Sequence, residues 1–323
     1  MLYIQAKVHP PPLKGPLFST IFTDGGHPRA KKTGSAGTEG VGGTGFGHHL
    51  CTRFFDMKTL YIPGSGIACA YSVTGNGPDV ILLHGLCESG EIWHAHAQAL
   101  SRQYRVLVPD MPGYGRSEPY PDGDFSLERM QKAVFAMADA EGMDTFSLAG
   151  HSMGGYTALA MLEAQPRRIE RISLFHSTSR ADSDEKKKGR DKSVKVLRQN
   201  RDLFFREVFK NLFNSERLEE FMPLIQHLYA QSAAIETETV VHTLFALRDR
   251  KDRFALLRDY AGPVSYFIGR HDNVLPAGEL IREAEALGVP FHVSEISGHM
   301  GFYEAGEETA GYLEAFLRET QKK

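Results

Sequence analysis

The stretch that decides the fold of this 323-residue chain reads Gly150-His151-Ser152-Met153-Gly154-Gly155. Residues 146–149 before it predict a strand, and residues 153–164 have helical character. A Gly-x-Ser-x-Gly sequence between a strand and a helix is typical of a nucleophile elbow, a tight turn that projects a serine hydroxyl. Glycines flank the serine because side chains there would collide with the adjoining strand and helix.

From residue 57 onward, strand and helix patterns alternate. Predicted strands cover residues 60–62, 67–73, 80–83, 104–108, 146–149, 169–175, 264–268 and 291–296. Predicted helices cover residues 88–102, 126–141, 153–164, 278–287 and 303–320. This repeated order predicts an α/β fold with a mostly parallel sheet covered by helices.

Residues 181–258 interrupt the alternation and contain no convincing strand. Four amphipathic helices are expected there, over residues 188–200, 202–211, 216–230 and 236–247. Asp182 and Glu185 have the spacing of a capping box at the start of this region. We therefore expect two core segments, 57–180 and 259–323, and a helical cap, 181–258. The cap should lie over the carboxyl ends of the strands, where open α/β sheets bind ligands.

Residues 1–56 differ in composition from the rest, because they contain 10 of the 32 glycines and the run Pro10-Pro11-Pro12. Such a segment buries too little apolar surface to offset its ordering entropy, so we expect a disordered Gly/Pro-rich extension. Met57 stands directly before the patterned sequence. The alternative is therefore that residues 1–56 come from a miscalled start.

Composition excludes several classes of protein. The 37 Lys and Arg residues against 40 Asp and Glu give a net charge of −3, which argues against a nucleic-acid partner. The sequence has no run of ~18 apolar residues, so it predicts no membrane span. Three cysteines without zinc-ligand spacing indicate neither a disulfide framework nor a metal site, and they favour a reducing, cytoplasmic location.

A second motif, His84-Gly85-Leu86, follows the predicted strand 80–83. It would bring the backbone N–H of Leu86 beside the elbow, where it could form an oxyanion hole with the N–H of Met153. His84 itself could act as a base, but a structural histidine that bonds the surrounding loop is the favoured interpretation.

Two more motifs supply an acid and a histidine. Asp272 follows the predicted strand 264–268, where an orienting carboxylate belongs. His299 follows the predicted strand 291–296 and can reach both Ser152 and Asp272 from there. The order along the chain is therefore Ser152, Asp272, His299.

Other polar residues are given no catalytic role. His94 and His96 could suggest a metal pair, but residues two apart on a helix point in different directions, which favours surface or rim positions. Ser117 and His176 could lie near the pocket.

From Met57 to the C-terminus, these motifs in this order resemble the α/β-hydrolase family. Residues 110–117 are similar to the family's loop after the fourth strand. The resemblance implies an eight-stranded sheet with an antiparallel second strand and a helical cap after the sixth strand. Haloalkane dehalogenases and epoxide hydrolases carry an aspartate at the elbow, so Ser152 argues against both. Relatives with a serine include carboxylesterases, lactonases, C–C bond hydrolases and some acyltransferases.

We therefore expect a serine hydrolase that cleaves small carboxylic esters or lactones through an acyl-enzyme. His299 would take the proton of Ser152, and Asp272 would orient the imidazole. A small molecule is the expected partner, and this chemistry requires no metal or organic cofactor. The alternatives are a C–C bond hydrolase of a diketone-type substrate and a small-molecule receptor with a hydrolase fold.

Overall fold

The sheet of this protein has eight strands in the order β1-β2-β4-β3-β5-β6-β7-β8. The structure is a computed structural model that describes residues 56–318, so the expectation for residues 1–55 lies outside it. The strands are β1 (Met57–Tyr61), β2 (Ala68–Thr74), β3 (Asp79–Leu83), β4 (Arg105–Pro109), β5 (Phe146–His151), β6 (Ile169–Phe175), β7 (Val264–Gly269) and β8 (Phe291–Ser294). β2 runs antiparallel to β1 and β4, and all other neighbours are parallel. The predicted sheet is therefore confirmed.

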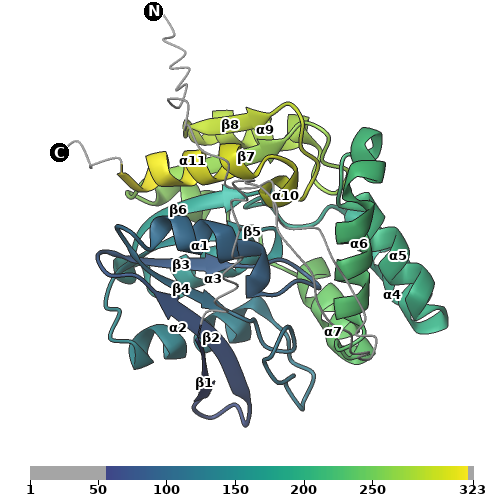
Figure 1. Ribbon diagram of the computed structural model, residues 1–323, viewed down its shortest axis with the longest axis horizontal. Helices are drawn as coiled ribbons and strands as arrows, with labels where there is room; N and C mark the ends of the chain where they lie inside the picture. Colours follow the sequence, from purple (N-terminus) through teal and green to yellow (C-terminus); the bar gives the residue numbers. More distant parts are fainter. Residues whose placement is uncertain (1–55, 319–323) are drawn as a thin grey trace, which may run out of the picture.

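Helices cover both faces of the sheet (Figure 1). α1 (His94–Leu100) and α11 (Gly306–Arg318) contact each other on one face. α2 (Leu127–Ala140) and α3 (Met153–Ala164) contact each other on the other, and α9 (Ala277–Leu287) packs against β7 and β8. Since both faces are covered, β5 and β7 are buried along their whole length, which explains why both are rich in apolar residues.

Two predicted helices are divided in the structure. The first, at residues 88–102, consists of the 3-10 turn η1 (Gly90–Trp93) and α1. The second, at residues 303–320, consists of α10 (Gly301–Glu304) and α11, separated by Ala305. At the second break the buried carboxylate of Glu304 accepts the N–H groups of Asn214 and Gly298, at 2.7 and 2.8 Å. These tertiary hydrogen bonds outweigh local helical propensity.

Helices also fill the connection between β6 and β7. They are α4 (Asp184–Gln199), α5 (Arg201–Asn211), the turn η3 (Ser215–Arg217), α6 (Leu218–Ser232) and α7 (Thr237–Arg248), followed by α8 (Phe254–Asp259). We call residues 184–248 the helical insertion; its helices gather at one side of the sheet (Figure 1). The insertion bonds to loops at the carboxyl ends of the strands. Tyr114 Oη donates to Thr243 Oγ1 at 2.8 Å, and His299 N–H donates to Leu212 O at 2.7 Å.

The predicted capping box at the start of the insertion is wrong. Ser183 is the N-cap of α4, and its Oγ accepts the N–H of Lys186 at 3.2 Å. Asp182 instead lies buried and accepts hydrogen bonds from Arg190 and Arg250, each at 2.5 Å. The side chain of Arg250 is only 3% exposed, and a buried guanidinium requires a counter-charge. This pair ties the two ends of the insertion together.

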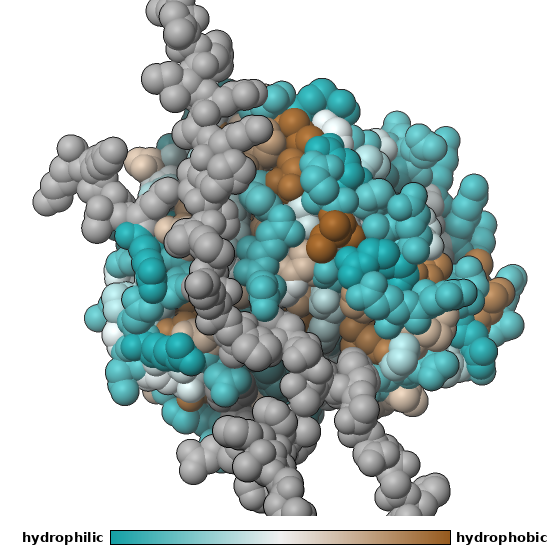
Figure 2. All heavy atoms as spheres, turned by 45° about the horizontal axis from the view of Figure 1, so that its top comes forward, coloured by the Kyte–Doolittle hydropathy of each residue, from teal (hydrophilic) through white to brown (hydrophobic). Residues whose placement is uncertain are grey.

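The surface of the described chain is largely polar. The face in Figure 2 is mostly hydrophilic, and its hydrophobic residues form small, separate patches. The exposed large hydrophobic side chains are Tyr61, Val196, Leu203 and Ile296. Between residues 56 and 318, no helix has the length and apolar character needed to cross a membrane.

The substitution Arg250→Met should destabilise the protein, because it leaves the buried Asp182 with the more exposed Arg190 as its remaining cation. Breaking a buried pair in this way typically costs about 3 kcal/mol. Thermal unfolding should show a Tm lower by about 6–10 °C.

The matched control is Arg198→Met, which breaks a pair whose side chains are 52% and 56% exposed. Its Tm should stay within about 1 °C of the unmodified protein, since exposed ion pairs contribute little. An equal decrease in Tm in both variants would show that the buried pair stabilises the protein no more than the exposed pair does.

Candidate active site

Ser152 lies in a strained turn between β5 and α3. Its backbone has φ +50° and ψ −113°, a conformation that residues with a Cβ rarely adopt. Its neighbours His151 and Met153 are buried, whereas Ser152 is half-buried. The turn therefore lifts this side chain out of the core, as the elbow motif predicts.

Close approach of the chain explains the glycines of the elbow. A Cβ at Gly150 would lie 2.5 Å from the carbonyl carbon of Gly154. A Cβ at Gly154 would lie 2.2 Å from the carbonyl oxygen of Leu83, at the end of β3. Both positions require glycine because the obstructing atoms belong to the backbone and cannot turn away.

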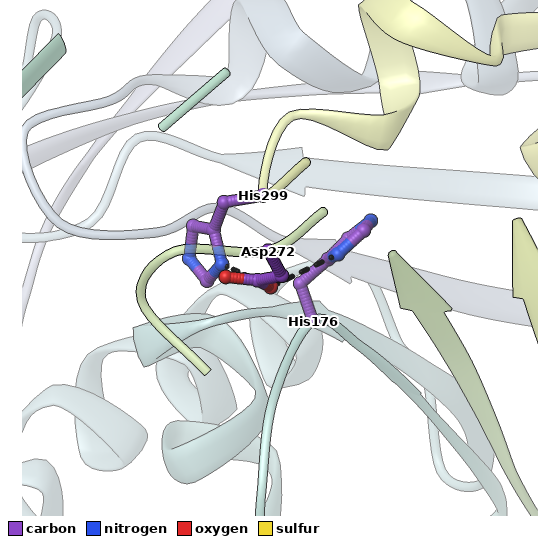
Figure 3. Close-up of side chains that lie close together, drawn as sticks. All are labelled: His176, Asp272 and His299. Carbon is purple, nitrogen blue, oxygen red and sulfur yellow. Dashed lines mark hydrogen bonds and ion pairs between the residues drawn. The ribbon is translucent and has the colours of Figure 1, made fainter. Parts of the chain in front are cut away.

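Asp272 and His299 are brought together as the sequence predicts. The Nδ1–H of His299 donates to Asp272 Oδ2 at 2.7 Å (Figure 3). The other oxygen, Oδ1, accepts the N–H groups of Val274 and Leu275, both at 2.8 Å. Burial alone would raise the pKa of the Asp272 carboxyl, but the nearby imidazoles and their hydrogen bonds hold it well below its usual range. Asp272 is therefore a carboxylate that orients His299.

His176 lies on the other side of Asp272 (Figure 3). Its Nδ1 is 3.3 Å from Asp272 Oδ2, the same oxygen that His299 contacts. Burial lowers the pKa of His176 to about 4, so its imidazole is neutral at neutral pH. Its backbone has φ +47°, a second strained residue at a strand end.

The two N–H groups expected to form an oxyanion hole have no acceptor in the described part of the chain. Met153 is the first residue of α3, where backbone N–H groups lack a helical partner. Leu86 follows β3 in the loop that packs against the elbow, since a Cβ at Gly85 would lie 2.9 Å from His151 Nδ1.

His84 has a structural role. Its Nε2 accepts the N–H of Met111 at 2.8 Å, so the proton must be on Nδ1, which donates to Gly85 O at 2.8 Å. Both ring nitrogens are used, which agrees with the favoured interpretation. The expectation that His96 lies at the surface or rim is wrong: it is buried, and its Nε2 is 2.9 Å from Thr309 Oγ1, because α1 packs against α11.

Three side chains could in principle hold a metal ion. His176, Asp272 and His299 offer ligand atoms within 4.8 Å of one another. However, Asp272 Oδ2 accepts the proton of His299, and a metal ion at that oxygen would have to displace it. The arrangement therefore fits an acid–base pair better than a metal centre.

Two further residues of the site, Glu88 and His151, were not predicted from the sequence. His151 is the last residue of β5, and its ring lies between Glu88 and the carbonyl oxygen of His299. The available signal was a glutamate two residues after the His84-Gly85-Leu86 motif and a histidine inside the elbow motif.

A family model described as alpha/beta hydrolase fold matches residues 78–306. The chain belongs to the alpha/beta hydrolase fold family. A thermophilic esterase from Thermogutta terrifontis has a similar structure, with a TM-score of 0.75 at 25% identity, covering 81% of this chain and 98% of that chain.

Two curated relatives of this alpha/beta hydrolase are named as esterases. The pimeloyl-(acyl-carrier protein) methyl ester esterase of Aeromonas salmonicida is 33% identical over 104 residues, which cover 32% of this chain and 39% of that protein. The enzyme of the same name from Aliivibrio fischeri is 27% identical over 270 residues, which cover 77% of this chain and 97% of that protein. The matches to the first curated relatives span about two fifths of their length.

Relief of the strain at Ser152 can be measured. Ser152→Gly should be more thermally stable than Ser152→Ala, because glycine adopts a positive φ without penalty. Strain of this kind costs about 1–3 kcal/mol, and the greater freedom of glycine in the unfolded chain offsets part of the gain. The comparison requires only the Tm values of the two variants. A lower Tm for Ser152→Gly would show that the turn stores no strain.

Proposed function

We propose that this protein is a serine hydrolase that cleaves small carboxylic esters or lactones. Ser152 is the nucleophile, His299 the general base and acid, and Asp272 the residue that orients His299. The observation that carries the proposal is the 2.7 Å hydrogen bond between His299 Nδ1 and a buried carboxylate, at the strand ends that also present Ser152. Membership of the alpha/beta hydrolase fold family and the named esterases among its relatives support it.

The reaction has two halves. In the first, His299 Nε2 accepts the proton of Ser152 while Oγ attacks the acyl carbon, and the imidazolium then gives the proton to the leaving alcohol. In the second, His299 takes a proton from water as the water oxygen attacks the acyl carbon, and the imidazolium then returns this proton to Ser152 Oγ as the acid leaves. Asp272 stabilises the imidazolium in both halves without accepting its proton.

The N–H groups of Leu86 and Met153 would hold the oxyanion of each tetrahedral intermediate. One such donor typically contributes about 3–4 kcal/mol to lowering the barrier. Both donors lie in rigid surroundings, because Met153 opens a buried helix and Leu86 lies in a loop pressed against it. They need no reorganisation as the charge develops.

A cavity of about 550 Å³, a size that suits a small substrate, lies beside the loop that follows β3. Cys87 and Glu88 of the loop after β3 line it, and so do His227 and Gln231 of α6. Ser152 is not among its lining residues. We infer that the helical insertion acts as a cap that shapes the space for one side of the substrate.

Hydrolysis of p-nitrophenyl esters across acyl chain lengths tests the proposal. The full chain should turn over short acyl chains, and Ser152→Ala should lose this activity. Asp272→Asn should lower kcat by about 10³–10⁴-fold, because the amide favours the wrong tautomer of His299.

Thermal unfolding of each variant controls for loss of fold. An inactive but folded full chain would contradict ester hydrolysis. Cleavage of a vinylogous diketone by that protein would instead favour the C–C hydrolase, which uses the same residues.

A further inference from the structure

Glu88, His151 and His299 are joined in one buried chain of hydrogen bonds. Glu88 Oε2 is 2.9 Å from His151 Nδ1, and His151 Nε2 is 2.9 Å from the carbonyl oxygen of His299. The same oxygen of Glu88 accepts the N–H of Gly85 at 2.6 Å. Glu88, His151 and His299 are all buried, so water does not compete for these bonds.

The partners of His151 identify its protonation state. A carbonyl oxygen can only accept a hydrogen bond, so His151 Nε2 must carry a proton. While Glu88 is ionised it can likewise only accept, so Nδ1 then carries a proton as well. An imidazole with both nitrogens protonated is a cation. With Glu88 ionised, the geometry therefore describes a buried ion pair in which Glu88 is negative and His151 positive.

The electrostatic surroundings agree with this charge state. Burial alone would lower the pKa of His151, but the charge and hydrogen bond of Glu88 outweigh it and raise that pKa. Burial alone would raise the pKa of Glu88, and His151 holds it below its usual value. The titratable groups that face His151 come from four strand-end loops: Glu88 and His84 after β3, His176 after β6, Asp272 after β7 and His299 after β8.

We propose that Glu88 and protonated His151 are positioning residues for the ester hydrolysis assigned above, on which this inference rests. The pair links the loop that carries the Leu86 N–H, the elbow that carries Ser152, and the backbone of His299. Its positive end faces His299, since the two ring centroids are 4.9 Å apart. The charge therefore lies within range of the general base, so its removal should change the pH profile of the reaction.

Nuclear magnetic resonance tests the charge state without any substrate. With ¹⁵N-labelled histidine in the full chain, His151 is assigned by comparison with His151→Gln. At pH 7.5 its two ring nitrogens should both show the shifts of protonated nitrogens. A neutral His151 at this pH would overturn the proposal.

Kinetics tests the positioning role. His151→Gln keeps a donor for the His299 carbonyl but removes the positive charge while Glu88 remains. We expect kcat to fall about 10–100-fold with KM changed less than about threefold, because reacting groups are displaced slightly. The acid limb of kcat/KM should move about 0.5–1 pH unit upward, because a positive charge beside the general base is lost.

Glu88→Gln and a control complete the series. Without its carboxylate, His151 should lose its charge, so Glu88→Gln should move the acid limb upward by less than His151→Gln does. The control is His96→Gln, another buried histidine, which bonds only Thr309 within the described residues and should leave the limb in place. A purely structural role would lower Tm and activity without this order of shifts. If His151→Gln fails to fold, the pH profile of Glu88→Gln and the NMR measurement still test the proposal.

Failure of the two proposals can be told apart. A folded wild-type protein that neither hydrolyses esters nor is labelled at Ser152 by a phosphonate ester overturns the function, and the positioning role with it. Normal wild-type activity with unchanged pH profiles in both variants overturns the positioning role alone.

Discussion

The positive φ of Ser152 is the constraint on which the rest of the site depends. It allows the chain to leave β5, present one side chain and enter α3 within a single residue, and it requires glycine wherever the backbones then touch. In the described chain, positive φ outside glycine occurs at Cys87, Ser152 and His176 alone. These residues lie in the turns that follow β3, β5 and β6. Strain of about 1–3 kcal/mol per residue is tolerated there because the buried sheet and helices leave these turns no alternative.

Two buried carboxylates accompany this strained backbone, and both face histidines. Asp272 contacts His299 and His176, while Glu88 contacts His151. Removing such charges from water is costly, so buried pairs are poor evidence for stability in their own right. In this site the carboxylates hold the orientation of the histidines that they contact. Each carboxylate also accepts backbone N–H groups of its own loop, and these bonds fix the carboxylate before it fixes the imidazole.

Local sequence patterns predicted the strand ends, and with them the placement of Ser152, Asp272 and His299, because a strand and its terminal turn are encoded within a few residues. The Glu88–His151 pair could not be found in this way, since its members are 63 positions apart and His151 is 148 positions from His299. The capping box predicted for Asp182 was wrong for a related reason. Its spacing matched a cap, but the guanidinium of Arg250, 68 positions away, provides a stronger partner in the buried environment. Contacts between distant segments depend on how the helices dock, and the periodicity of the sequence does not encode this docking.

The backbone of His299 shows how these distant contacts combine. Its N–H donates to Leu212 in the helical insertion, and its C=O accepts from His151 beside the elbow. Its side chain is held by Asp272, so every polar group of the residue except Nε2 has a partner among residues 56–318. The insertion that borders the cavity thus also holds the histidine. A shift of α5 relative to the sheet would move Leu212, and through it the imidazole. The lining of the cavity and the placement of the His299 imidazole are therefore coupled through one backbone hydrogen bond, while the bond from His151 ties the same residue to the rigid sheet.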